Sequence, residues 1–590
     1  MERHSLAVSP APVKSGGARM KKVINTAMTV EYSRSSNARQ RLARDPRSVL
    51  LAVLFTSWNS VASASDTEMR AEMEALKAQV RRLEHRLESQ TKDRKGTNRE
   101  VERVTKSDAS SAKSDALWPD VFHYKNVTLK PGGFFEFGAV HRDRFMGADL
   151  ATPFGNIPYA NNPTSHDGET RFTARRSRFT LQTDANLDDE THARLYFAAD
   201  FLSAAQTANL TQSDSFNLRF RELYTSLDRS DYGLHVSAGQ MYSLASLNSR
   251  GTTPDAFLVP PVIDDQYLPG YTWSRQPGVR ISKDLPYDLQ IAVGAEAAYT
   301  NFAAPGMNFT GTVAPIPANG VSQTLPGTYY PGAYSQNPIG GSLYNSLNAV
   351  TFNHVPDLMT KASWDPTLFD RKIHIEGGGM LRNLNDRTFG GNHDVWAGSG
   401  FIGVTVPVIP KLVDFQLSGI TGRANGRYGS ASIADATFDW TGAPQPIHER
   451  QLLVGVTVHP TPKTDVYAFA GGEFAGAQYS TVSLPKTAYL AGGVYSFGYG
   501  NPGFVNSGCS VEGSYTGGPY GLIGSCVGQT KSLRQLTGGV WHNFYDGPGG
   551  KVRVGAQYSY TIKDSFIGVG GAPKATENMI FLSLRYMPFN

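Results

Sequence analysis

Apolar and polar residues alternate along most of this chain, in short segments that Gly-, Asn- and Pro-rich stretches separate. The alternation begins near Gly132 and continues to the C-terminus. In residues 578–586 (NMIFLSLRY), every second residue from Ile580 to Tyr586 is apolar, and Arg585 lies among the residues between them. Successive side chains of a strand point to opposite faces of its sheet. The pattern therefore predicts a large sheet with one apolar and one polar face.

The apolar face of such a sheet must be covered. A water-soluble protein would cover it with a second layer, but residues 131–590 show no helical periodicity that could supply one. Backbone inside a bilayer must satisfy its own hydrogen bonds, and a closed barrel does so with lipid outside and water inside. We therefore expect an all-β fold in which residues 131–590 form a transmembrane antiparallel β-barrel.

Seventeen segments carry the strand pattern. Bacterial single-chain barrels have even strand numbers, so we expect sixteen strands, or else eighteen. The segments are 133–145, 171–186, 191–202, 216–228, 232–242, 276–283, 287–300, 357–365, 371–384, 394–408, 411–423, 449–459, 464–475, 486–498, 531–545, 551–562 and 577–588.

Short connections alternate with long ones along this series of strands. In outer-membrane barrels the short turns lie on the periplasmic side and the long loops lie outside the cell. The sequence therefore predicts the orientation of the barrel as well as its existence. The long connections are 146–169, 243–275, 301–356, 424–448 and 499–530.

Residues 1–64 have the features of a leader with a secretory signal. An apolar run, 48–57 (SVLLAVLFTS), follows several arginines and precedes 61–64 (VASA), where small residues fit cleavage after Ala64. A membrane anchor is the alternative, but the apolar run is short for a span. We expect the exported chain in the outer membrane of a bacterial cell.

A heptad pattern follows the leader over residues 65–91. Apolar residues recur there at alternating spacings of four and three, which is typical of a coiled-coil seam. A single amphipathic helix lying on another surface is the alternative, but an isolated helix of this length is marginal. The pattern therefore favours self-association, in the periplasm, with a polar linker over 92–130. The seam residues are Met69, Met73, Leu76, Val80, Leu83 and Leu87.

Charge and motifs exclude several classes of function. The whole chain has a net charge of +5, and residues 1–64 contribute +7 from ten Lys+Arg and three Asp+Glu, which leaves −2 for the remainder. A nucleic-acid partner is therefore not supported. No Gly-x-Ser-x-Gly, His-Glu-x-x-His or phosphate-binding glycine loop occurs, so we expect neither an enzyme nor a cofactor.

The only cysteines, Cys509 and Cys526, follow an export signal and predict a disulfide.

Arginines concentrate on the polar faces of the early strands. A lipid-facing arginine at mid-bilayer costs about 2–4 kcal/mol, so we expect these side chains in the lumen, where a basic ladder favours anions. The alternative is a rigid network with Asp184, Asp200 and Glu222 that confers no selectivity. The predicted pore-lining residues are Arg178, Arg194, Arg219, Arg221, Gln182 and Tyr196.

The connection 243–275 is too apolar for an exposed extracellular loop. We expect it to fold into the barrel and narrow the pore, or alternatively to pack against a neighbouring subunit; both can hold at once. If it folds inward, its carboxylates would face the basic ladder. The predicted constriction residues are Asp255, Asp264, Asp265 and Arg275.

Five short segments resemble DcaP-type porins and, more loosely, phosphate-selective porins. They are 171–181 (RFTARRSRFTL), 218–224 (LRFRELY), 238–242 (AGQMY), 275–277 (RQP) and 584–589 (LRYMPF). The resemblance implies a homotrimeric, 16-stranded outer-membrane porin for small anions such as dicarboxylates or phosphate. The chain departs from this pattern in its long loops, 301–356 and 499–530, and in ending on Asn590 where an aromatic residue is expected.

Two functions from different classes remain open at this point. The first is a passive porin for small hydrophilic, anionic solutes. The second is a structural or adhesive outer-membrane surface protein with a packed lumen, in which the long loops bind and the coiled coil reaches toward the cell wall. The packing of the lumen separates them, because only an open lumen can conduct.

Overall fold

The computed structural model describes residues 121–202, 216–247, 251–303, 307–310, 353–388, 391–439, 443–484, 493–514 and 525–589. All of them belong to one compact unit, Ala116–Asn590. The predicted leader, 1–64, and the predicted coiled coil, 65–91, lie outside the described residues. No helix in the described ranges is long and apolar enough to cross a membrane.

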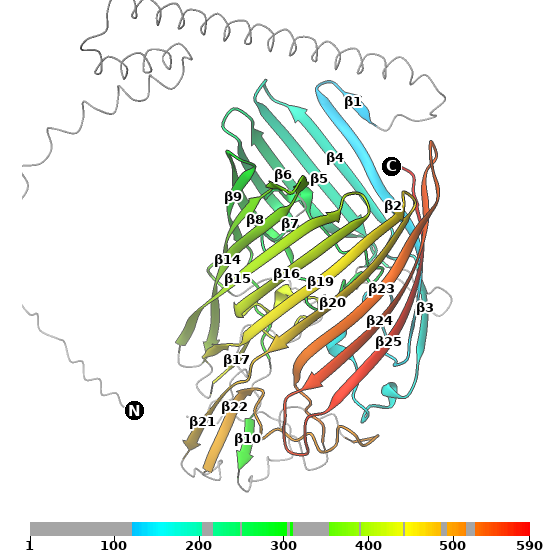
Figure 1. Ribbon diagram of the computed structural model, residues 1–590. Helices are drawn as coiled ribbons and strands as arrows, with labels where there is room; N and C mark the ends of the chain where they lie inside the picture. The colour runs from blue at the N-terminus through cyan, green and yellow to red at the C-terminus, as the bar shows by residue number, and fades with distance from the viewer. Residues whose placement is uncertain are drawn as a thin grey trace, which may run out of the picture. The chain divides into compact units, whose positions relative to one another are not determined.

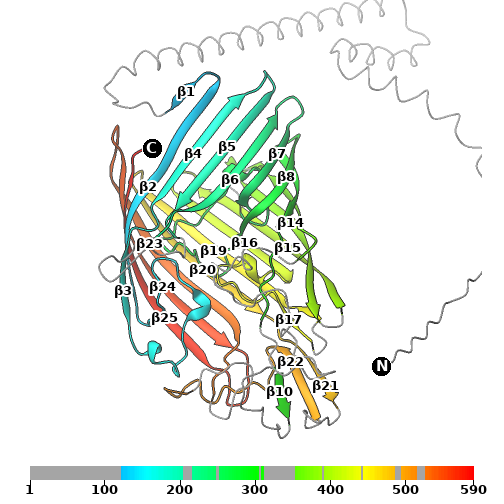
Figure 2. The same ribbon diagram turned by 180° about the vertical axis from the view of Figure 1, so that it is seen from behind.

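Antiparallel strands form a closed wall in this unit, and Figures 1 and 2 show it from two sides. The described strands fill sixteen wall positions, because β3 and β4 share one position as successive partners of β2. Closure comes from the first and last strands of the wall, where β2 pairs with β25 and Phe135 lies opposite Tyr586. The wall strands are β2 (Val127–Arg142), β3 (Glu169–Thr173), β4 (Arg178–Asn186), β5 (Thr191–Asp200), β6 (Arg219–Arg229), β7 (Leu234–Tyr242), β8 (Arg275–Leu285), β9 (Leu289–Glu296), β11 (Asp357–Trp364), β14 (His374–Thr388), β15 (Gly391–Ile409), β16 (Val413–Arg423), β19 (His448–Thr461), β20 (Thr464–Ala475), β23 (Thr530–Gly547), β24 (Gly550–Ser565) and β25 (Lys574–Met587).

One of the seventeen predicted segments, 486–498, is not a wall strand. Its described part belongs to β22 (Gly493–Tyr499), which pairs with β21 (Gln478–Leu484) and β10 (Met307–Thr310) in a separate sheet at the loop end of the barrel (Figure 1). Alternation predicts that a segment is extended, but it does not identify the neighbours of that strand. The other sixteen segments each overlap a wall position, which agrees with the expected count of sixteen.

The barrel begins earlier than the sequence suggests. β2 starts at Val127, inside the range assigned to the linker, and the short β1 (Phe122–Tyr124) folds back to pair with its first residues. The remaining short elements lie in the connections. They are η1 (Phe154–Asn156), η2 (Pro163–Ser165), η3 (Pro254–Ala256), η4 (Gly426–Tyr428), β12 (Thr367–Leu368), β13 (Arg371–Lys372), β17 (Ala436–Phe438) and β18 (Pro444–Pro446).

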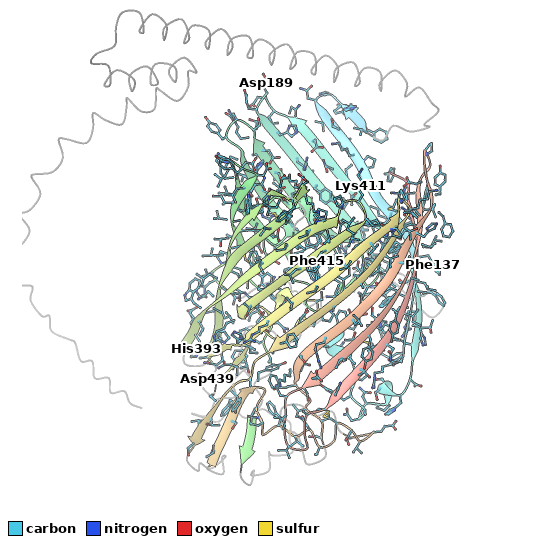
Figure 3. All side chains as sticks on the ribbon, in the orientation of Figure 1. Phe137, Asp189, His393, Lys411, Phe415 and Asp439 are labelled. Carbon is cyan, nitrogen blue, oxygen red and sulfur yellow. A yellow bond between two sulfur atoms is a disulfide. The ribbon has the colours of Figure 1, made fainter. Side chains whose placement is uncertain are left out.

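The two ends of the barrel differ in the length of their connections. Short turns join strands at the end that carries Asp189 and Lys411 in Figure 3, and most of the long loops lie at the end that carries His393 and Asp439. The connection between β14 and β15 at the loop end is an exception, since only two residues separate these strands. In bacterial barrels the short turns face the periplasm, so this asymmetry orients the wall.

The outer surface of the wall is apolar. On β25, Leu582 is 53% exposed, whereas its neighbour Phe581 points inward and is 0% exposed. Phe137 of β2 likewise points away from the barrel, as Figure 3 shows. Large apolar side chains in such numbers on an outer face are compatible with lipid and not with water. The barrel is therefore transmembrane.

The largest apolar cluster lies inside the barrel. Three connections supply most of its loop residues: those between β2 and β3, between β7 and β8, and between β16 and β19. They pack against inward-facing side chains of β19, β20, β23 and β25, so this side of the lumen is filled by folded loop. The residues at the centre of the cluster include Leu150, Ile157, Val262, Tyr267, Ile433, Leu453, Tyr467, Phe469, Trp541 and Phe581.

Candidate functional site

A β-bulge determines which side chains of β6 face the lumen. The pairing of β5 with β6 shifts register, so that Ala198 lies opposite Glu222 and Ala199 lies opposite Phe220. The extra residue is Arg221, and a bulge of this kind turns two successive side chains toward the same face. Both Arg221 and Glu222 are buried, while Phe220 is exposed on the outer surface. Regular alternation would put Arg221 and Glu222 on opposite faces, although the alternative network drawn from the sequence already includes Glu222; the bulge is what brings both side chains inside.

Arg219 and Arg221 share a single carboxylate. The Nε and Nη2 atoms of Arg219 donate to Asp200 at 2.9 Å each, and the Nη1 of Arg221 donates to the same group at 2.6 Å. Asp200 is fully buried. Two guanidinium groups thus share this one carboxylate, and Arg221 also lies 3.7 Å from Asp265 of the connection between β7 and β8.

Three of the other predicted wall residues, Arg194, Gln182 and Tyr196, form a second group toward the short-turn end, whereas Arg178 lies opposite Asp200. Arg194 donates to Asp184 at 2.8 Å and to Asp255 of the connecting loop at 2.6 Å. Gln182 donates to Asp184 at 2.7 Å, so that this carboxylate is held from two sides. The ring of Tyr196 packs on Tyr224 with centroids 5.4 Å apart.

The connection between β7 and β8, residues 243–274 and here termed the β7–β8 loop, runs into the barrel. Wall side chains bind its backbone: Glu473 of β20 accepts from the N–H of Gly270 at 3.0 Å, and Gln557 of β24 accepts from the N–H of Ile263 at 2.6 Å. The indole Nε1 of Trp541 on β23 donates to the carbonyl of Pro261 at 2.8 Å. The loop therefore extends from β7 to strands near the end of the chain.

Loop and wall meet with no side chain between them at one point. Gly270 has a φ of +92°, and a Cβ on it would lie 2.1 Å from the carbonyl oxygen of Leu452. A Cβ on Gly471 of β20 would lie 2.0 Å from the carbonyl oxygen of Pro269. Glycine at both positions permits the backbones to touch.

The loop carboxylates have different surroundings. Asp265 accepts from Arg176 Nε at 3.0 Å and lies 3.7 Å from Arg221. Burial alone would raise the pKa of Asp265, but Arg221 and Arg176 hold that pKa well below its ordinary value. Asp264 instead accepts from the backbone N–H of Thr152, and burial raises its pKa to about 6. Asp264 therefore binds a neighbouring loop and makes no ion pair with the predicted basic ladder among the described residues.

Arg275 belongs to the wall and not to the loop, since it is the first residue of β8. Its guanidinium lies over the rings of Tyr242, at 5.3 Å, and Trp273, at 5.7 Å. Arg176 was not predicted as a site residue. The predicted strand 171–186 gives Arg176 the same phase as Arg178, so alternation would have placed it in the lumen as well. In the structure it lies in the irregular stretch between β3 and β4, which interrupts that predicted strand.

Water reaches part of this inner wall. The side chains of Arg219, Arg178 and Arg194 are 35%, 24% and 21% exposed, although all three belong to inward-facing positions. That of Arg221 is 1% exposed. The lumen thus has a packed side, next to β19–β25, and a hydrated side, next to β4–β6.

The two cysteines form a disulfide away from these charged groups. Cys509 and Cys526 bond within the connection between β20 and β23. The carbonyl of Cys509 accepts from the N–H of Asn161 at 3.1 Å. The disulfide therefore braces one long loop against another at the loop end of the barrel.

No protein-family model and no curated protein matches the sequence. Among solved structures, the chain is similar to the outer membrane channel DcaP of Acinetobacter baumannii. The identity is 14%, the TM-score is 0.52, and the match covers 79% of this chain and 99% of that one. The chain has the fold of this channel. The resemblance that the five sequence segments indicate is thus confirmed at the level of the fold.

Two further solved structures show weaker similarity. The OmpT protein of Vibrio cholerae is 10% identical, with a TM-score of 0.38 and coverage of 79% of this chain and 99% of that one. An anion-selective porin from Comamonas acidovorans is 8% identical, with a TM-score of 0.39 and coverage of 78% and 99%. At these identities, the similarity concerns the course of the backbone and not the side chains of the lumen.

Proposed function

We propose that this chain is an outer-membrane porin through which small hydrophilic solutes, above all small anions, diffuse passively. The observation that carries the proposal is the partial exposure of Arg178, Arg194 and Arg219 inside a closed barrel. A charged, hydrated inner wall behind an apolar outer wall gives polar solutes a route across a bilayer. The fold shared with an outer membrane channel supports the same function.

A structural or adhesive surface protein remains the alternative. Its lumen would be packed throughout, and the side next to β19–β25 is indeed filled by the folded loops. The side next to β4–β6 keeps three arginines accessible to water. This hydrated side favours the porin.

Anion preference is supported by the ratio of arginines to carboxylates on the wall. Asp200 is shared by two arginines, and Asp265 lies within 4.0 Å of three. Low-dielectric walls focus the field of such an excess and concentrate counter-ions. Arginine can also hold a carboxylate or phosphate through two parallel hydrogen bonds, so dicarboxylates and phosphate are suitable solutes.

Single-channel conductance in a salt gradient tests this proposal. We expect an ion current whose reversal potential has the sign that indicates anion selectivity, and a reversal potential of smaller magnitude in Arg219→Gln. Arg219 is the right target because it is accessible, whereas Arg221 is buried between Asp200 and Asp265. Arg229→Gln is the matched control, since this arginine pairs with Asp231 at the end of β6. Absence of current would favour the structural alternative, and a reversal potential of zero would remove the anion preference.

The assembly state follows from the region ahead of the barrel. We propose a homotrimer in the outer membrane, held in part by the seam of residues 65–91 in the periplasm. Deleting residues 65–92 should weaken the oligomer and leave the barrel folded, as shown by mass measurement in detergent and by heat-modifiable migration on a gel. A monomeric full-length chain in detergent would contradict the proposal.

A further inference from the structure

Arginine and aromatic side chains alternate in a stack on the inner wall. The guanidinium of Arg178 lies 5.4 Å from the ring of Phe134, and that of Arg585 lies 4.9 Å from the same ring. Arg585 also lies 4.5 Å from the ring of Trp541, whose ring is 3.9 Å from the guanidinium of Arg553. These five residues, here termed the arginine–aromatic stack, come from β4, β2, β25, β23 and β24.

The stack is built into the wall and held beside the β7–β8 loop. Trp541 is 1% exposed and is fixed by its hydrogen bond to Pro261 of that loop. A Cβ on Gly555, its partner on β24, would lie 2.5 Å from the indole ring, so glycine is what makes room for the tryptophan. Phe134 lies directly opposite Arg178 in the pairing of β2 with β4. The geometry of the stack is thus set by strand register.

Carboxylates neutralise this stack only in part, since Arg178 lies 4.0 Å from Asp265, which Arg176 and Arg221 also approach. Glu136 accepts from Arg585 at 2.8 Å and also lies 3.6 Å from Arg176, so one acid serves two bases. Among the described residues, Arg553 forms no ion pair within 4.0 Å, and its Nε is buried without a hydrogen-bond acceptor. The Nε of Arg178 is also buried without an acceptor. These Nε atoms are out of reach of a solute, but Arg553 as a whole is only half-buried, so the rest of its guanidinium is the part that an acceptor brought by a solute can meet.

A guanidinium group offers two kinds of contact. Its faces attract π systems, and its N–H edge binds a carboxylate through two parallel hydrogen bonds. The half-buried Arg553 uses one face against Trp541. A flat solute that carries both a ring and a carboxylate can place its ring on the face of one guanidinium while its carboxylate accepts from the N–H edge of a neighbouring arginine, and Arg553 and Arg585 lie directly opposite each other on β24 and β25. An aliphatic carboxylate can use only the edge.

We propose that the arginine–aromatic stack is a binding site for planar aromatic carboxylates, which the lumen takes up in preference to aliphatic anions of the same charge and size. This inference rests on the proposed porin function and adds to it a site and a class of solute. The site lies on β2 and on the last strands of the barrel. Its Trp541 borders the apolar cluster that packs this side of the lumen, whereas Arg553 and Arg585 lie near the short-turn ends of β24 and β25; the site meets the predicted basic ladder only at Arg178.

Block of chloride current through single channels tests the site, with benzoate and cyclohexanecarboxylate as the probes. These anions match in charge and nearly in size and differ in aromaticity. We expect benzoate to reach half-block at a concentration roughly fivefold lower than cyclohexanecarboxylate does, because one cation–π contact is worth a factor of about that size. Arg553→Lys keeps the charge and loses the planar face, so it should bring the ratio of the two half-block concentrations close to one. Arg534→Lys, at an exposed position paired with Asp564, is the matched control and should keep the wild-type ratio.

Each outcome decides the inference. Chloride current with equal half-block by the two anions would overturn the aromatic site and leave the porin function intact, whereas absence of any current would overturn both. Should Arg553→Lys fail to fold by heat-modifiable migration, Phe134→Leu replaces it. That variant removes the ring between Arg178 and Arg585, and it should lower the ratio; an unchanged ratio would overturn the site.

Discussion

Asp265 of the β7–β8 loop and Arg221 of β6 lie 3.7 Å apart at their charged atoms. The other oxygen of the same carboxylate accepts from Arg176 at 3.0 Å. Asp265 is thus the charged contact that holds the tip of the loop against the arginine wall, where all three side chains are buried.

Asp265→Asn should loosen this contact. Removing one partner of a buried ion pair leaves the other charges uncompensated, at a cost of about 3–5 kcal/mol. We expect a lower midpoint of thermal unfolding in detergent and a larger, noisier single-channel conductance. Asp231→Asn removes an exposed pair with Arg229 and should change neither quantity. Equal conductance in wild type and Asp265→Asn would mean that the ion pair does not position the loop.

Asp264 should make stability depend on pH. Its pKa is raised from 3.8 to about 6 because burial penalises the charged form, so the folded state retains the proton longer than the unfolded state does. Stability from this residue is greatest below pH 4, falls by about 3 kcal/mol as the pH rises to 6, and is constant above that.

Asp264→Asn is expected to remove this part of the pH dependence. Unfolding midpoints of the variant should exceed those of wild type at pH 7 and approach them at pH 4. Asp546→Asn, in an exposed pair with Lys551, is the control and should follow the wild-type profile. A variant that is less stable than wild type at pH 7 would show that the charged form of Asp264 stabilises the folded protein.

Gly471→Leu should push the β7–β8 loop away from β20. A side chain at this position would overlap the carbonyl of Pro269, and such overpacking costs about 1–3 kcal/mol. We expect a higher conductance with the barrel still heat-modifiable. Ala470→Leu, on the outer face of the same strand, is the control. Identical conductance in the two variants would mean that the loop does not limit the current.

Reduction of the Cys509–Cys526 disulfide should act locally. The bond closes a loop with a sequence separation of 17. Closing a loop of this length lowers the conformational entropy of the unfolded segment, which stabilises the folded loop by roughly 3 kcal/mol. We expect faster proteolysis within residues 499–529 and unchanged heat-modifiable migration. The double variant Cys509→Ser/Cys526→Ser should behave as the reduced protein does, and reductant should add nothing to it. Loss of the barrel on reduction would contradict this local role.

The hairpin of β21 and β22 should be dispensable for the barrel. Gln478 lies opposite Tyr499 at its base, and neither strand pairs with the wall. Replacing residues 480–497 by a short Gly-Ser linker should therefore preserve heat-modifiable migration and ion current. Removing a wall hairpin of similar length, β8 with β9 (residues 275–296), should abolish both. Failure of the first variant to fold would mean that the barrel wall needs this segment.

The amino-acid sequence by itself determined the wall. Alternation is a local property, because each side chain faces the opposite way from its neighbour, and lipid on one side keeps the pattern regular. For this reason the positions of sixteen strands, the apolar face of residues 578–586 and the inward direction of Arg178, Arg194 and Arg219 could be predicted.

Only the tertiary structure decided what the inward side chains contact. The bulge at Arg221, the separate sheet of β22 and the different surroundings of Asp264 and Asp265 depend on register and on neighbours distant in the sequence. The arginine–aromatic stack exists because β2 pairs with β25, which joins the first and last strands of the wall. Such pairing is fixed by closure of the whole barrel, and no local pattern of residues encodes it.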